Sequence, residues 1–150
     1  MTKGRMLQDI MVSLGGRIAE EIIFNDVTTG AQSDIMKATK AARRMVTRYG
    51  MSENVGIINY EDDEDEVFIG RDLAHAKNHS EEVSGQIDRE VKAIIDDCYS
   101  KAKEIILEQE NVLHKCAELL LEKEKIGRAE FEALFDKEYP QPEDPAGTMA

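Results

Sequence analysis

Residues 7–23 read LQDIMVSLGGRIAEEII. Apolar side chains recur in this stretch at spacings of three and four, which is the pattern of an amphipathic helix. They are Leu7, Ile10, Met11, Leu14, Ile18 and Ile22. A second apolar line on the other side consists of Val12, Gly16, Ala19 and Ile23. We therefore expect the helix to be sandwiched between neighbours, with Gly15 and Gly16 allowing another backbone to approach closely.

A second helix is predicted downstream, after the break at residues 25–30. Its apolar face consists of Ile35, Ala38, Ala42, Met45, Val46 and Tyr49. Gly50 then offers a C-terminal stop. Beyond it, the β-rich stretches 56–60 and 66–70 flank six consecutive acids and predict a small β-hairpin with a solvated acidic tip.

Three more helices are predicted in the rest of the chain. Ser80 is a good N-cap for a long helix with an acidic first turn. Asn111 can cap a fourth helix, and a short fifth helix runs from about Arg128 to Lys137, with Phe131, Leu134 and Phe135 directed inward. The sequence therefore predicts a mainly α fold of about five helices over residues 1–139, followed by a flexible, proline-containing tail over residues 140–150.

Composition excludes several classes of protein. A net charge of −12 argues against a nucleic-acid surface, because a phosphate backbone needs a basic one. No apolar run approaches the roughly 20 residues that span a bilayer, so we expect this segment to be soluble, without membrane contact. Cys98 and Cys116 fall at apolar helical positions outside any C-x-x-C pair, which favours buried, reduced thiols.

Asp34 is the first candidate for chemistry. At about 100° per residue it lies within roughly 40° of Ala38, on the apolar face of the second helix. One interpretation is structural: Ser33 caps the helix, and Asp34 interacts favourably with the helix dipole. The other is a metal ligand, since a carboxylate can complete an open zinc site that also has two histidines. The spacing alone leaves both interpretations open.

The histidines are weaker candidates. His75 and His79 stand four apart, but Ala76 occupies the place of the glutamate in H-E-x-x-H, and no stretch of the chain carries that motif. We therefore interpret them as solvated loop residues. His114 has no second ligand at a suitable spacing and is interpreted as a surface or half-buried side chain.

Several strings resemble, in order, the motifs of FtsH-family proteases. Residues 14–21, LGGRIAEE, resemble the family's L-G-G-R-x-A-E-E helix, and residues 28–34, TTGAQSD, resemble its T-T-G-A-x-N-D. Residues 42–52, ARRMVTRYGMS, and residues 67–71, VFIGR, continue the likeness, which runs from about Thr2 to Leu134. Ordered motifs of this kind are far more specific than any one of them.

The resemblance implies a helical peptidase domain in which Asp34 is the third zinc ligand, beside two histidines of an upstream H-E-x-x-H. Ser33 replaces the family's usual Asn. Glu20, the first glutamate of A-E-E, either orients a zinc-bound histidine or is a surface carboxylate. No catalytic residue of the family falls within this chain.

The intact protein implied by the resemblance is a membrane-anchored, ATP-dependent zinc endopeptidase. It binds ATP and Mg²⁺ in a separate AAA module, forms a hexameric ring, and degrades unfolded or membrane proteins, with this segment on the cytoplasmic face of the membrane. In the family, the H-E-x-x-H helix, ATPase module and membrane segment precede the part that matches here. We therefore expect the 150-residue chain alone to be metal-free and inactive.

Two alternatives remain at this stage. The first is a non-enzymatic helical module for oligomerisation or partner binding; an upstream coding sequence without H-E-x-x-H and a phosphate loop would favour it. The second is a metal site centred on His75 and His79. In that case replacement of both histidines would remove the metal, whereas Asp34→Ala would not.

Overall fold

The computed structural model describes residues 1–61 and 80–135, and in these two ranges the chain is mainly helical. The helices are α1 (Lys3–Phe24), η1 (Thr29–Ala31, a 3₁₀ turn), α2 (Gln32–Thr47), α3 (Glu81–Glu108), α4 (Glu110–Lys123) and α5 (Arg128–Glu132). The chain divides into two compact units, Met1–Glu108 and Gln109–Ala150. The prediction of a mainly α fold with five α-helices is confirmed, whereas the predicted tail lies outside the described residues.

Helix α1 is longer than the decisive stretch of sequence and is capped at both ends. Thr2 is its N-cap, and the Thr2 hydroxyl accepts a hydrogen bond of 3.1 Å from Arg5 N. At the other end, Asn25 adopts a left-handed conformation with a φ of 50° and donates its backbone N–H to Glu21 O. Asn tolerates this conformation better than most residues, so it ends the helix cleanly.

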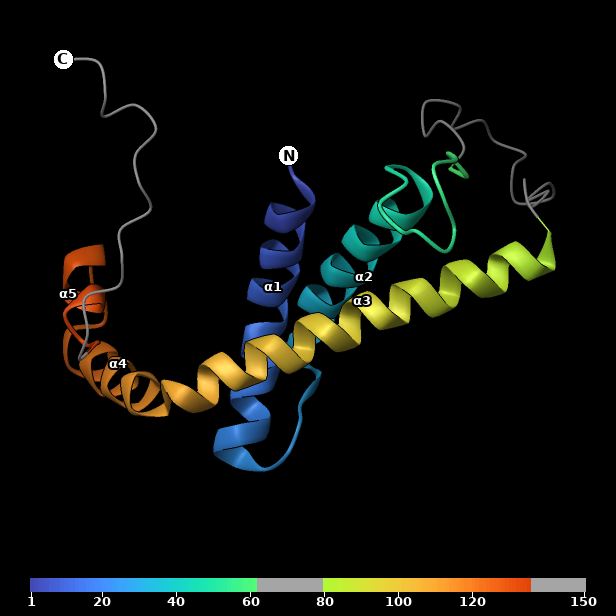
Figure 1. The fold of residues 1–150 in the computed structure, drawn as a ribbon. Helices are drawn as coiled ribbons and strands as arrows, with labels where there is room; N and C mark the ends of the chain where they lie inside the picture. The colour runs from blue at the N-terminus through green and yellow to red at the C-terminus, as the bar shows by residue number, and fades with distance from the viewer. Residues whose placement is uncertain (62–79, 136–150) are drawn as a thin grey trace, which may run out of the picture. The chain divides into compact units, whose positions relative to one another are not determined.

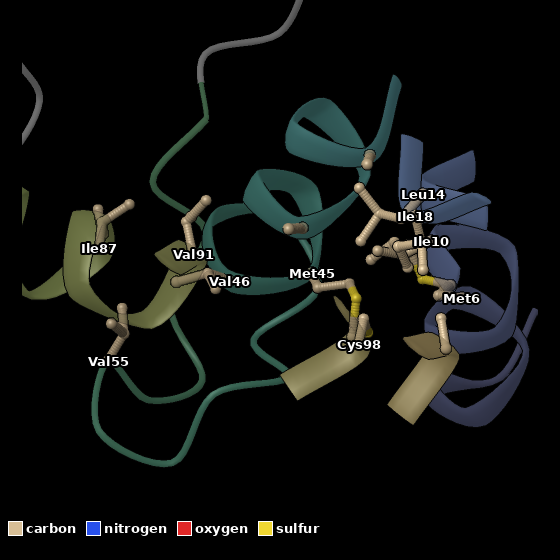
Figure 2. Packing of buried hydrophobic residues seen from close by; sticks show 13 residues of the cluster. Met6, Ile10, Leu14, Ile18, Met45, Val46, Val55, Ile87, Val91 and Cys98 are labelled. Atoms are coloured by element: carbon tan, nitrogen blue, oxygen red, sulfur yellow. The ribbon is translucent and has the colours of Figure 1, made fainter. Parts of the chain in front are cut away.

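The core of the first unit lies where α1, α2 and α3 meet. Each of the three helices contacts the other two, and the long α3 crosses both α1 and α2 (Figure 1). Figure 2 shows Met45 of α2 and Cys98 of α3 beside the apolar stripe of α1. The buried members of this cluster are Met6, Ile10, Leu14, Ile18, Ala38, Ala42, Met45, Val46, Val55, Ile87, Val91, Cys98 and Ala102.

The second apolar line of α1 does not pack as predicted. Val12 is 79% exposed, and among the described residues nothing lies within 4 Å of a Cβ built on Gly15 or Gly16. The expectation of a sandwiched helix is therefore wrong for the part of the chain that the structure describes. The reason is that α2 and α3 both pack on the side of α1 that carries Ile10, Leu14 and Ile18.

Helix α2 ends two residues earlier than its apolar pattern. Gly50 has a φ of +59°, and the turn around it lets Met51 N donate to Met45 O at 2.8 Å. A Cβ on Gly50 would lie 3.0 Å from Ile57 Cα, so glycine is required for both its φ and its lack of a side chain. The predicted stop at Gly50 is confirmed, although Tyr49 is exposed rather than inward.

The first half of the predicted β-hairpin is not found. Residues 56–60 form no strand, and Ile57 is 94% exposed. Gly56 has a φ of +89°, and Tyr60 N donates instead to Thr47 O at the end of α2, at 2.7 Å. This tertiary hydrogen bond replaces the ladder that the β-rich composition predicts. The second half, residues 66–70, lies outside the described residues.

Helix α3 begins as predicted. Ser80 Oγ accepts a hydrogen bond of 3.2 Å from Val83 N, and Glu81 and Glu82 make the first turn acidic. Farther along, Glu90 accepts a hydrogen bond of 2.5 Å from Asn54 Nδ2, which ties α3 to the loop after α2.

The second unit contains α4 and α5, and both differ in detail from the prediction. Helix α4 begins at Glu110 with Gln109 as N-cap, without a side-chain capping bond, so the prediction of Asn111 as the cap is wrong. Helix α5 ends at Glu132, and Phe131 is exposed rather than inward, although its ring packs edge-on against Phe135 with centroids 5.3 Å apart. Lys123 Nζ lies 2.9 Å from Glu130 Oε2 and links the two short helices.

Among the described residues, no helix combines the length and the apolar composition that crossing a membrane requires.

Candidate metal site

Asp34 lies at the third residue of α2, in the first helical turn. Its side chain is half-buried. Within residues 1–61 and 80–135 it makes no hydrogen bond and no ion pair. A negative charge in this turn interacts favourably with the helix dipole, and this interaction does not occupy the carboxylate oxygens. The carboxylate is therefore available to a ligand.

The structural interpretation of this turn needs a correction. Ser33 is not the N-cap: the N-cap of α2 is Ala31, which makes no side-chain capping bond. The chain enters α2 directly from η1, whose last hydrogen bond runs from Gln32 N to Thr29 O. Ser33 consequently has helical rather than extended backbone and cannot act as a cap.

Thr28 is the residue that caps this region, and sequence reasoning missed it. Its Oγ1 accepts a hydrogen bond of 3.1 Å from Gly30 N at the start of η1. A threonine two residues before a glycine is a recognised turn signal, because the hydroxyl can bond to the nearby backbone. That local pattern could have identified Thr28.

Glu20 of α1 holds Thr28 in place. The Thr28 hydroxyl donates to Glu20 Oε1 at 2.5 Å, and Thr28 N donates to Glu20 Oε2 at 3.4 Å. Both carboxylate oxygens of Glu20 therefore bind the loop that leads to Asp34. The predicted role of Glu20 toward a zinc-bound histidine stays a prediction.

Gly30 sits where these groups meet. A Cβ on Gly30 would lie 3.2 Å from Thr28 Oγ1 and 3.8 Å from Glu20 Oε1. The first distance is too short for an ordinary contact, so a side chain here would push Thr28 away from its partners. The glycine of the T-T-G-A string therefore has a packing role.

Three more residues extend these contacts around Thr28, and the sequence could have predicted only one of the added contacts. Arg17 Nη1 donates to Thr28 O at 3.0 Å, and Arg17 Nε lies 3.6 Å from Glu21 Oε1. The Tyr99 hydroxyl, on α3, donates to Glu21 Oε2. The spacing of Arg17 and Glu21 by four residues on one helix could have predicted their pairing. Nothing local could have predicted the contact with Tyr99.

The other sequence candidates lie elsewhere. His75 and His79 fall outside the described residues. The side chain of His114 is 57% exposed and lies 3.6 Å from Glu110, which confirms its interpretation as a surface residue. Cys98 and Cys116 are free thiols; Cys98 is buried and Cys116 only half-buried. Where the structure describes the chain, no three His, Cys, Asp or Glu side chains gather as a metal site.

Comparison with known proteins gives consistent matches. The sequence model of peptidase family M41 matches residues 1–134. The ATP-dependent zinc metalloprotease FtsH of Caldicellulosiruptor bescii is 51% identical over 141 residues, 93% of this chain and 23% of that protein. The FtsH of Acholeplasma laidlawii is 53% identical over 115 residues, 77% of this chain and 18% of that protein. The chain spans less than a quarter of the length of these curated relatives.

Proposed function

Because the chain belongs to peptidase family M41, we propose that it is part of an ATP-dependent zinc metalloendopeptidase and that Asp34 supplies one ligand of the metal. The observation that carries the proposal is the position of Asp34 in a first helical turn, where its carboxylate binds no other described residue. Zinc accepts the carboxylate oxygens of Asp as ligands, so the side chain of Asp34 is chemically suited to bind it.

The remaining ligands come from outside this chain. One carboxylate does not hold zinc against water, and the 150 residues contain no H-E-x-x-H. Two histidines and a glutamate base on another segment of the intact protease complete the site. When bound, zinc supplies Lewis-acid chemistry for hydrolysis of a peptide bond. The role of this chain is to present and orient one ligand.

The intact protein follows from the same proposal. Its ATPase module, which binds ATP and Mg²⁺, and its membrane anchor lie outside this chain, which faces the cytoplasm. It assembles as a hexameric ring that degrades unfolded or membrane polypeptides. The lengths of the relatives support an intact protein with further modules, because the chain matches less than a quarter of each relative.

A substitution at Asp34 tests the ligand role. In the intact protease, Asp34→Asn keeps the shape of the side chain but removes its charge, and we expect zinc affinity to fall by at least about 100-fold. The measurement is zinc content after dialysis against a chelator of known affinity. In the 150-residue chain, where only the dipole interaction is lost, the free energy of unfolding should fall by about 0.3 to 1 kcal/mol.

Asp26→Asn is the matched control. Asp26 precedes the same turn and accepts a hydrogen bond of 2.8 Å from Val27 N, which an asparagine oxygen can also accept. This variant removes a nearby charge and should leave zinc content unchanged. Full zinc retention by Asp34→Asn would contradict the proposal and leave Asp34 with the helix-dipole role alone.

The isolated chain gives a second test. We expect isothermal titration of the 150 residues with zinc to show no tight stoichiometric binding, and we expect no peptidase activity. One zinc bound tightly per chain would mean that the ligands are not divided between segments.

A further inference from the structure

A chain of polar contacts leads from α3 to the turn before α2. The Tyr99 hydroxyl donates to Glu21, Glu21 pairs with Arg17, and Arg17 Nη1 donates to the backbone oxygen of Thr28 at 3.0 Å. Thr28 in turn donates to Glu20 through both its hydroxyl and its backbone N–H. We refer to these five residues as the polar chain. It connects three separate segments of the first unit.

The polar chain ends on the turn that starts α2. Thr28 Oγ1 accepts the hydrogen bond from Gly30 N, and η1 continues without a break into α2. Asp34 follows within the first turn. A short, continuous helical segment transmits the placement of Thr28 to the carboxylate of Asp34, because few backbone torsions lie between them.

The central ion pair is protected in a way that surface pairs are not. The side chains of Arg17 and Glu21 are 26% and 29% exposed, against 66% and 46% for Arg5 and Asp9 at the same spacing on the same helix. Less solvent means less screening, so this pair holds its geometry better than an exposed pair. The Tyr99 hydroxyl, from α3, adds a hydrogen bond to Glu21 of this pair. The stability of α1 as a helix does not require that hydrogen bond.

We propose that Tyr99 and Arg17 are positioning residues for Asp34: through Glu21 and Thr28, they hold the turn that begins α2 and so determine where the Asp34 carboxylate lies. The functional consequence rests on the proposed metal-ligand role of Asp34. The mechanical consequence does not, because it concerns only how firmly α3 holds the turn.

The mechanical consequence is tested on the 150-residue chain without metal. Tyr99→Phe removes the hydroxyl and keeps the ring. Amide hydrogen exchange followed by NMR should become about ten-fold faster at Thr28 and Gly30, whose N–H groups are bound in the turn. The amides of Val46 and Val91, in the core, should keep their exchange rates. Unchanged exchange at Thr28 and Gly30 would overturn the proposal.

Tyr49→Phe is the matched control. The Tyr49 ring packs on Arg48, with the guanidinium carbon 5.8 Å from the ring centroid, and its hydroxyl bonds to no described residue. This variant should leave exchange at Thr28 and Gly30 unaltered. A second variant, Thr28→Val, removes the oxygen that accepts from Gly30 N, so its exchange rate at Gly30 gives the reference for a fully released amide.

The functional consequence is tested in the intact protease with Co²⁺ as the probe. Tyr99→Phe should weaken Co²⁺ binding by about ten-fold and change its visible absorption, which reports ligand geometry. An unchanged affinity and spectrum would overturn the positioning role. If Asp34→Asn alone leaves the metal bound, the ligand proposal fails, whereas the exchange result on the isolated chain still decides whether α3 holds the turn.

Discussion

At the scale of single residues, the two cysteines experience different surroundings. Cys98 is buried between α1 and α2, and its Sγ lies 3.7 Å from the carbonyl oxygen of Leu7, to which the thiol donates. Burial raises the pKa of Cys98, and the charge of Asp97 raises it further. Cys116 is only half-buried. The two thiols should therefore differ in reactivity.

We predict that iodoacetamide modifies Cys116 at least about ten-fold faster than Cys98 in the folded chain. The thiolate is the reacting form, and a raised pKa lowers its fraction at any pH below that pKa, so Cys98 is slowed by its pKa as well as by burial. Mass spectrometry of peptides after timed quenching at pH 8 measures both rates. In denaturant the two rates should converge. Equal rates in the folded chain would contradict the burial of Cys98.

The residues of the candidate site differ in how well the sequence predicts their positions. Helical phase alone placed Asp34 on an inward-facing line at a helix start, and the structure has it half-buried in the first turn. The predicted cap was wrong, because Ser33 already lies inside the helical segment that the 3₁₀ turn capped by Thr28 begins. Tyr99 lies 78 residues from Glu21, so no local pattern could connect them.

At the scale of helices, α1 uses only one of its two apolar lines. The line through Ile10, Leu14 and Ile18 is buried, whereas Gly16 is exposed on the other side with open space around it. A glycine in an open helix interior loses conformational entropy on folding and gains no contact in return. This makes Gly16 a site at which the isolated chain can be stabilised.

We predict that Gly16→Ala increases the free energy of unfolding of the 150-residue chain by about 0.5 to 1 kcal/mol, measured by urea denaturation. Gly50→Ala is the contrasting variant. It should lower the free energy of unfolding by at least about 1 kcal/mol, because its φ is +59° and the new Cβ would meet Ile57. A loss of stability in Gly16→Ala would mean that another segment occupies this face.

The helices differ in how well the sequence predicts them. Periodicity identified α1 to α4 because each has an apolar stripe, whereas α5 has only five residues and none of them is buried. Ser80 was a correct start because its capping bond is local. The boundaries of α4 and α5 were predicted less accurately, since they depend on the turns that connect these short helices. The strand predicted for the β-rich residues 56–60 is wrong, because Tyr60 N donates its hydrogen bond to the end of α2.

At the scale of the whole molecule, the buried cluster is confined to the first unit. Its members run from Met6 to Ala102, and no described residue of the unit that begins at Gln109 belongs to it. The apolar burial that stabilises α1, α2 and α3 is therefore contained within one part of the chain.

We predict that residues 1–108 fold alone. Far-UV circular dichroism should show a helical spectrum and a cooperative thermal transition, because the residues that form the core are all present. Residues 109–150 alone should show little helix, since α4 has 14 residues and α5 has five, lengths at which isolated helices are marginal in water. If residues 1–108 lacked a cooperative transition, the second unit would have to contribute to the stability of the first.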